Sequence, residues 1–256
     1  MKMLQRLWVL CSLLFALSAQ AGQITIAAAA DLKFALDEIV STFKKAHPGD
    51  TLEVIYGSSG KFHTQIQQGA PYDLYFSADI DFPRALVKKG LAGTEVKPYG
   101  VGRLVLWSTS LDASRMTLAS LADPKITRIA IANPKHAPYG KRAEEALRAA
   151  GLWAVVEPKL VYGENIAHAA QFVQTGNAQV GLIAQALALS PELASKGGYS
   201  LISDQLHAPL EQGFIITQRA AGNALAKRFA DYMGSPGARA VMTRYGFVLA
   251  GDLGAK

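Results

Sequence analysis

Strand-like and helix-like segments alternate along almost the whole chain. The strand patterns are short and apolar, as in QITIAAA at 23–29 and DLYFS at 73–77. The helix patterns between them repeat apolar residues every three or four positions, as at 31–46. Regular alternation with short connections is typical of mostly parallel sheets that helices cover on both faces. The sequence therefore predicts an α/β fold.

The first 21 residues have the features of a secretory leader. Lys2 and Arg6 precede an apolar stretch at 7–17 that is too short to span a bilayer, and Ala19-Gln20-Ala21 fits a cleavage site. We predict a signal peptide at 1–21, cleavage after Ala21 and export. The one cysteine of the chain, Cys11, falls in this segment. The exported protein therefore cannot form a disulfide and must be stabilised by its core.

The charge pattern gives little indication of a macromolecular partner. The formal net charge is +6 at pH 7, and no block of Lys and Arg concentrates it. This pattern argues against nucleic acid and weakly favours small anions. The histidines at 63, 136 and 168 have no metal-ligand spacing, so we predict neither a metal ion site nor a cofactor.

The loop YGSSGK at 56–61 joins a strand pattern to a helix pattern, an arrangement that gathers N–H groups around an anion. A nucleotide-binding loop needs G-x-x-x-x-G-K-[ST], but here only two residues separate Gly57 from Gly60. Ser58 and Lys61 have the spacing of an acylating serine and its lysine, without the S-D-N-like and K-T-G-like partners. The loop therefore favours an oxyanion, and a Ser58/Lys61 hydrolase is the alternative from another functional class.

Three further strand-to-helix junctions carry related chemistry. They lie at 28–32, 133–140 and 163–167, and Asp31 and Asn165 occupy helix-cap positions in two of them. Ligands of α/β sheets bind beyond the carboxyl ends of the strands. With the YGSSGK loop, two junctions fall in each half of the chain, which predicts a site in a cleft between two lobes.

Four segments carry a resemblance to a known family. They are ITIAAAADLKFALDEI, YGSSGKFHTQIQQGAPYDLYFSAD, IANPKHAPYGKRAEEAL and DYMGSPGARAVMTRYGFVL. In this order they resemble the periplasmic molybdate-binding proteins of bacterial ABC importers, over essentially the whole chain after residue 21. The resemblance implies a two-lobed periplasmic binding protein fold of type II, in which two crossing hinge strands join the lobes. Here those strands would be 102–108 and 213–218, which places lobe 1 at 22–103, lobe 2 at 104–212 and the return to lobe 1 at 213–256.

The resemblance also implies a function. The protein would capture molybdate or tungstate with neutral hydrogen-bond donors and deliver it to an inner-membrane ABC permease. It would be a periplasmic monomer, not an enzyme, and would hold its metal only as the oxyanion. Carried over by motif, the site residues are Ala30, Asp31, Ser59, Tyr139 and Ile166. A receptor for another oxyanion or a small carboxylate is the alternative among binding proteins.

Asp31 is the predicted site residue that would repel a dianion. At about 4 Å and an effective dielectric near 20, each pair of like unit charges costs about 4 kcal/mol. Three arrangements avoid this cost: Asp31 caps its own helix, pairs with Lys33 or Lys61, or carries a proton and donates a hydrogen bond. We predict the cap, with Lys61 as the candidate counter-charge and Ser58 as support for its turn.

Overall fold

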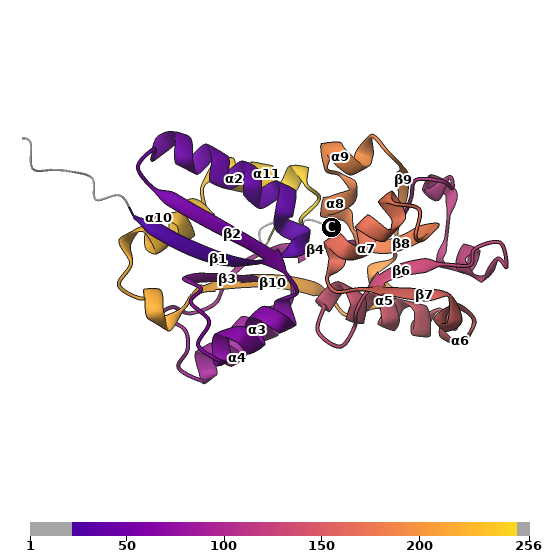
Figure 1. Ribbon diagram of the computed structural model, residues 1–256, viewed down its shortest axis with the longest axis horizontal. Helices are drawn as coiled ribbons and strands as arrows, with labels where there is room; N and C mark the ends of the chain where they lie inside the picture. The colour runs from indigo at the N-terminus through magenta and orange to yellow at the C-terminus, as the bar shows by residue number, and fades with distance from the viewer. Residues whose placement is uncertain (1–21, 250–256) are drawn as a thin grey trace, which may run out of the picture.

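The structure, a computed structural model, describes residues 22–249 (Figure 1). The predicted signal peptide, its cleavage site and residues 250–256 lie outside the described residues. Two lobes lie side by side, and each is a five-stranded sheet with helices on both faces. The predicted two-lobed α/β fold is thus confirmed. Between residues 22 and 249 no helix is long and apolar enough to cross a membrane.

Lobe 1 is built on a sheet with the strand order β2-β1-β3-β10-β4. β1 pairs in parallel with β2 and β3, whereas β10 is antiparallel to β3 and β4. The strands are β1 (Gln23–Ala29), β2 (Thr51–Gly57), β3 (Leu74–Ser77), β4 (Lys97–Gly102) and β10 (Leu210–Ile216). One face packs against α2 (Lys33–Ala46), α10 (Ala224–Tyr232) and α11 (Pro236–Arg244), and the other against α3 (Ser59–Gln67) and α4 (Asp81–Lys88).

Lobe 2 repeats this architecture with the strand order β7-β6-β8-β5-β9. Here β6 pairs in parallel with β7 and β8, and β5 is antiparallel to β8 and β9. The strands are β5 (Leu104–Ser108), β6 (Ile129–Ala132), β7 (Leu160–Gly163), β8 (Val180–Ala184) and β9 (Gly198–Leu201). The helices are α5 (Pro138–Ala149), α6 (Trp153–Val156), α7 (Ile166–Gln174), α8 (Gln185–Ala188) and α9 (Pro191–Ala194).

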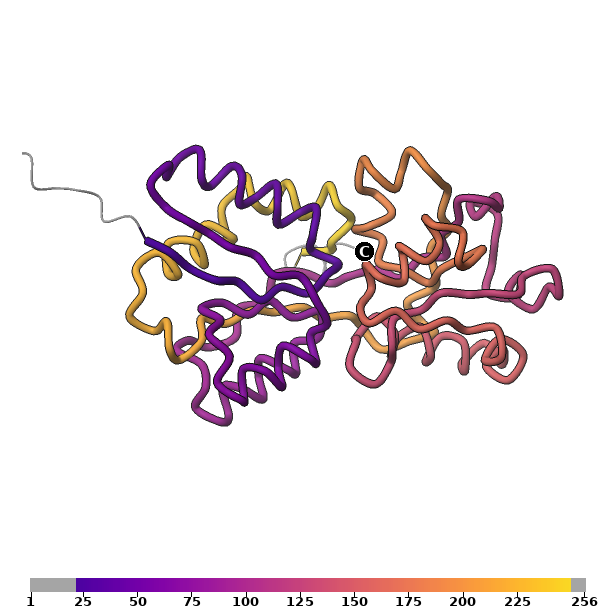
Figure 2. The backbone as a smooth tube through the Cα atoms, in the orientation of Figure 1, coloured from indigo at the N-terminus to yellow at the C-terminus, as the bar shows by residue number. Residues whose placement is uncertain are grey.

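The chain crosses between the lobes by two connections, which Figure 2 shows in magenta and in orange. The first crossing is at Arg103, between the end of β4 and the start of β5, and the second lies within 202–209. The predicted hinge strand at 102–108 therefore covers the last residue of β4, the crossing at Arg103 and the whole of β5 in the sheet of lobe 2. The strand predicted at 213–218 begins earlier, at Leu210, and belongs to the sheet of lobe 1. The lobe boundaries drawn from those strands stay predictions.

Two departures from the expected elements have local causes. β4 has the sequence KPYGVG, and its proline and glycines are poor strand formers, so the pattern gave no strand there. A helix pattern runs over 184–195 in the sequence, but the structure has two short helices there, α8 and α9. The helix breaks at Ser190, which caps α9 just before Pro191, because a residue before proline disfavours the helical conformation.

Candidate functional site

The four predicted junctions meet between the lobes and line one pocket. Lobe 1 contributes the end of β1 and the start of α3, and lobe 2 contributes the starts of α5 and α7. The five predicted site residues all line this pocket and are all buried: Ala30, Asp31, Ser59, Tyr139 and Ile166. The structure thus brings them together, while their contact with a ligand stays a prediction.

Helix starts give the pocket its electrostatic character. α3 begins at Ser59, α5 at Pro138 and α7 at Ile166, and the first N–H groups of a helix have no acceptor within the helix. These ends carry partial positive charge and favour anions. Asn165 caps α7 by accepting a hydrogen bond from the His168 N–H at 3.0 Å, as predicted.

The two neighbouring serines of the YGSSGK loop have different hydrogen bonds. Ser59 Oγ accepts from the Ala78 N–H at 3.0 Å, so its own proton is free for a further acceptor. Ser58 Oγ donates to the His136 carbonyl oxygen at 2.6 Å, so its proton is already used. Ser59 is therefore the serine that can donate into the pocket, and Ser58 supports the structure.

Lobe 1 and lobe 2 are in contact beside the pocket. The Gly60 N–H donates to the His136 carbonyl at 3.0 Å, and His136 Nδ1 lies 3.0 Å from Ser58 Oγ. Lys61 Nζ of α3 pairs with Glu164 Oε1 of lobe 2 at 3.0 Å, and the hydrogen bond from Lys61 holds the pKa of Glu164 below its usual value. The predicted pairing of Asp31 with Lys61 is therefore wrong, because Lys61 neutralises a carboxylate of the opposite lobe.

Asp31 is not a helix cap either. Residues 30–32 form a 3-10 turn, α2 starts only at Lys33, and no side chain caps either start. This extra turn places the Asp31 side chain in the contact between the lobes, where it is 1% exposed. Lys33, the other proposed partner, pairs with Asp37 at 3.3 Å. Both the predicted cap and the predicted ion pair are thus wrong.

The Asp31 carboxyl instead belongs to a buried polar network with residues that the sequence reasoning missed. Its Oδ2 accepts from Gln212 Nε2 at 2.8 Å, and Gln212 Nε2 also donates to Tyr139 Oη at 3.1 Å. Gln212 Oε1 accepts from the Tyr99 hydroxyl at 2.7 Å. Asp31 Oδ1 is buried without a hydrogen-bond partner. The strand predicted at 213–218 begins one residue after Gln212, so no pattern in the sequence pointed to this residue.

Burial dominates the protonation of this network. It raises the pKa of Asp31 to about 6, against the opposing effect of hydrogen bonds from Gln212, from Tyr139 and from the backbone of Asp31 and Leu32. Burial, together with the nearby Asp31 carboxyl, also holds the pKa values of Tyr99 and Tyr139 well above the usual value, so both phenols are neutral.

The close approach of the lobes at Gly60 leads to a testable expectation. A Cβ at this position would lie 2.5 Å from the His136 carbonyl oxygen. Gly60→Ala should therefore oppose contact between the lobes at an overpacking cost of about 1–3 kcal/mol. We expect ligand affinity, measured by calorimetry, to fall about tenfold or more.

Gly237 offers a matched control, because it is also the second residue of a helix and a Cβ there would meet no atom within 4 Å. Gly237→Ala should leave affinity unchanged. Equal affinities of the two variants and the unchanged protein would contradict the importance of the contact at Gly60.

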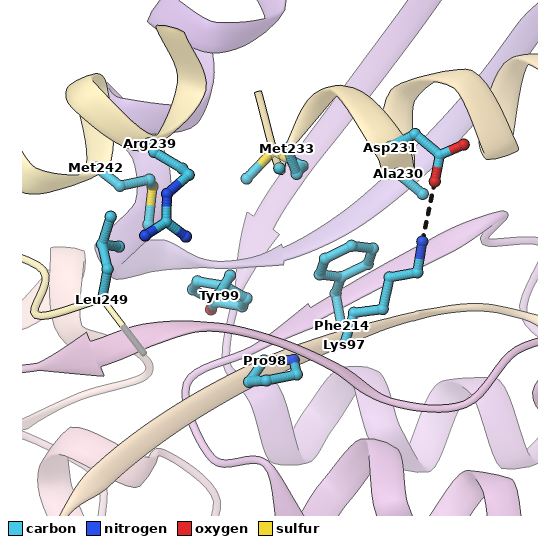
Figure 3. Close-up of a pocket in the computed structure, with 11 residues that line it drawn as sticks. Lys97, Pro98, Tyr99, Phe214, Ala230, Asp231, Met233, Arg239, Met242 and Leu249 are labelled. Carbon is cyan, nitrogen blue, oxygen red and sulfur yellow. Dashed lines mark hydrogen bonds and ion pairs between the residues drawn. The ribbon is translucent and has the colours of Figure 1, made fainter. Parts of the chain in front are cut away.

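A second pocket, of about 210 Å³, lies on lobe 1 away from the junctions (Figure 3). Its wall is mixed: Phe214 and the Tyr99 ring line it together with Arg239, and its Lys97 pairs with Asp231 at 3.0 Å. This pocket lacks the converging helix starts of the interlobe site. Within residues 22–249, no group of three His, Cys, Asp or Glu residues could hold a metal ion.

Comparison with known proteins agrees with this architecture. The model of the family described as bacterial extracellular solute-binding protein matches residues 24–248. The molybdate-binding protein ModA of Rhodobacter capsulatus is 37% identical over 91% of both chains. ModA of Azotobacter vinelandii is 36% identical over 92% of this chain and 94% of the length of that protein.

Solved structures give the same result. The periplasmic molybdate-binding protein of Azotobacter vinelandii superposes with a TM-score of 0.83 and 29% identity, over 88% of this chain and 99% of that chain. The sulfate-binding protein SubI of Mycobacterium tuberculosis, at 15% identity and a TM-score of 0.73 over 90% of this chain and 87% of that one, shares the fold. The chain therefore belongs to the bacterial extracellular solute-binding protein family and, within it, is a relative of the molybdate-binding proteins.

Proposed function

We propose that this protein captures molybdate in the pocket between its lobes and delivers it to the permease of an ABC importer. The observation that carries the proposal is the set of neutral donors around the pocket. The hydroxyls of Ser59 and Tyr139 lie with the N–H groups at the starts of α3 and α7; within residues 22–249 no Lys, Arg or His lines the pocket, and Asp31 is its one acidic residue. Relatives that are 36–37% identical are molybdate-binding proteins, which supports this ligand.

Neutral donors suffice to bind a tetrahedral dianion. Its oxygens only accept hydrogen bonds, and each bond to a charged group is worth about 1.5–3 kcal/mol. Sub-micromolar affinity requires about 8–12 kcal/mol, so about five to seven donors are enough after ordering costs. Donors on rigid helix starts also fix the size of the cavity, so molybdate and tungstate should bind better than the smaller sulfate.

We also propose the compartment and the oligomeric state in which the protein works. We infer that it works in the periplasm after cleavage behind Ala21, as a monomer without cofactor, enzymatic activity or nucleic-acid partner. The contacts of Ser58 and Lys61 support the absence of a hydrolase. Ser58 donates to a carbonyl oxygen and Lys61 pairs with Glu164, so the lysine is engaged away from the serine.

Titration calorimetry tests the function. The protein without residues 1–21 is titrated with molybdate, tungstate, sulfate and phosphate at pH 7. We expect one anion per chain, with molybdate and tungstate bound far more tightly than sulfate and phosphate. Tight binding of sulfate or phosphate without binding of molybdate would contradict the proposal.

A further inference from the structure

The Asp31 carboxyl has one satisfied oxygen and one unsatisfied oxygen at the wall of the interlobe pocket. Oδ2 accepts from Gln212, and Oδ1 is buried with no partner. A buried carboxyl oxygen without a partner is costly, unless a ligand or a proton completes it. We propose that Asp31 binds the oxyanion in its protonated form, so that each bound dianion brings one proton from solution; the inference rests on the proposed function.

The hydrogen-bond network determines which oxygen carries the proton. The Tyr99 hydroxyl lies 2.7 Å from Gln212 Oε1 and 3.0 Å from the Ser77 carbonyl oxygen, and in this arrangement Gln212 Nε2 faces Asp31 and Tyr139. Oδ2 therefore receives a donor and cannot donate to this amide. The proton belongs on Oδ1, the oxygen that lacks a partner and can donate to an anion.

Among the residues that the structure describes, no cation of the elements packed around Asp31 pairs with its carboxyl. On α2, Lys33 pairs with Asp37, and on α3, Lys61 pairs with Glu164 of the β7–α7 junction. The titratable groups that act on Asp31 from β4 and α5 are the neutral phenols of Tyr99 and Tyr139, and β10 contributes the uncharged Gln212. On α7, His168 lies at the Asn165 cap, and its Nδ1 is 3.2 Å from the Glu164 N–H. α8, with the sequence QALA, has no titratable side chain.

Protonation of Asp31 would also release a second donor. Tyr139 Oη accepts from Gln212, and its own proton can turn to an ionised Asp31 or to a ligand. When Asp31 is neutral, the phenol loses its charged acceptor within the protein. One proton therefore removes a repelling charge and makes two hydroxyl donors available to the anion.

The inference predicts a dependence of affinity on pH. Burial already raises the pKa of Asp31 to about 6 in the ligand-free protein. If only the protonated form binds, the molybdate Kd should weaken about 50-fold between pH 6 and pH 8, as proton linkage requires. Calorimetry at pH 8 in MOPS and in Tris, which differ in protonation enthalpy, should show uptake of close to one proton per molybdate.

The Asp31→Asn variant tests the role of the proton, because asparagine keeps the shape of the side chain but cannot ionise. An amide keeps an acceptor for Gln212 and presents an N–H where the protonated carboxyl presents its O–H. This variant should bind molybdate with a Kd independent of pH, take up no proton, and exceed the unchanged protein in affinity at pH 8. Asp81→Asn, which removes an exposed carboxylate on α4, should keep the pH dependence and the proton uptake.

The outcomes distinguish the inference from the function on which it rests. Equal molybdate affinity of the unchanged protein at pH 6 and pH 8, with heats that do not depend on the buffer, would overturn the inference and leave the proposed function intact. A failure of both the unchanged protein and Asp31→Asn to bind molybdate at any of these pH values would overturn both. Binding of hydrogen phosphate without binding of molybdate would overturn both, because it would point to an ionised Asp31 that accepts a hydrogen bond from the phosphate hydroxyl.

Discussion

Ser59→Ala should weaken molybdate binding about 10- to 150-fold, because it removes a charge-assisted hydrogen bond worth about 1.5–3 kcal/mol. The Ser59 hydroxyl accepts from the Ala78 N–H and keeps its proton for the pocket. Calorimetry at pH 6, where binding should be tight, measures the loss. Circular dichroism and the Tm of each variant would show that the fold is retained.

Ser58→Ala is the matched control for this change. The Ser58 hydroxyl donates to the His136 carbonyl across the interlobe contact, and a neutral hydrogen bond contributes about 0.5–1.5 kcal/mol. The loss of affinity should therefore be smaller than for Ser59→Ala, at about two- to tenfold. A larger loss in Ser58→Ala than in Ser59→Ala would contradict the assignment of the donor.

Asp31→Asn should stabilise the ligand-free protein at pH 8 by about 3 kcal/mol, because each pKa unit corresponds to about 1.4 kcal/mol. The pKa of Asp31 is raised from 3.8 to about 6 in the folded protein. Between these values the folded protein binds more protons than the unfolded chain, so the Asp31 contribution to stability is lost as the pH rises through 6. An asparagine cannot ionise and escapes this loss.

The pH profile of stability checks this expectation. Urea unfolding of both proteins without molybdate should give free energies of unfolding that diverge as the pH rises from 4 to 8. Asp81→Asn should show no such divergence. If Asp31→Asn had the same effect on stability at pH 4 and pH 8, the pKa of Asp31 would not be raised by burial in the folded protein.

The parts of the fold and site that the sequence predicted are those with local causes. Strand and helix patterns reflect which side chains face a core, and the β1, β2 and β3 segments were found within a residue or two. The junctions at Ser59 and Ile166 are strand ends followed by helix starts, and parallel sheets bring such ends to one edge. Local patterns and this one rule were enough to locate the pocket.

The parts that the sequence did not predict depend on contacts between distant segments. Gln212 reaches Asp31 only because β10 returns to lobe 1 beside β3, and nothing near either residue signals that contact. Lys61 has its partner in the opposite lobe, at Glu164. The role of Asp31 was predicted wrongly because one extra 3-10 turn moved its side chain from the helix end to the interlobe contact.

A crystal structure of the protein with bound molybdate, with the metal located by its anomalous scattering, would test the proposed site most directly. One anomalous peak should lie in the interlobe pocket, with anion oxygens within hydrogen-bond distance of Ser59 Oγ, Tyr139 Oη and the Ile166 N–H. Electron density for the anion should also lie beside Asp31 Oδ1. A peak in the lobe 1 pocket of Figure 3, or no peak from crystals grown in molybdate, would contradict the proposed function and the site together.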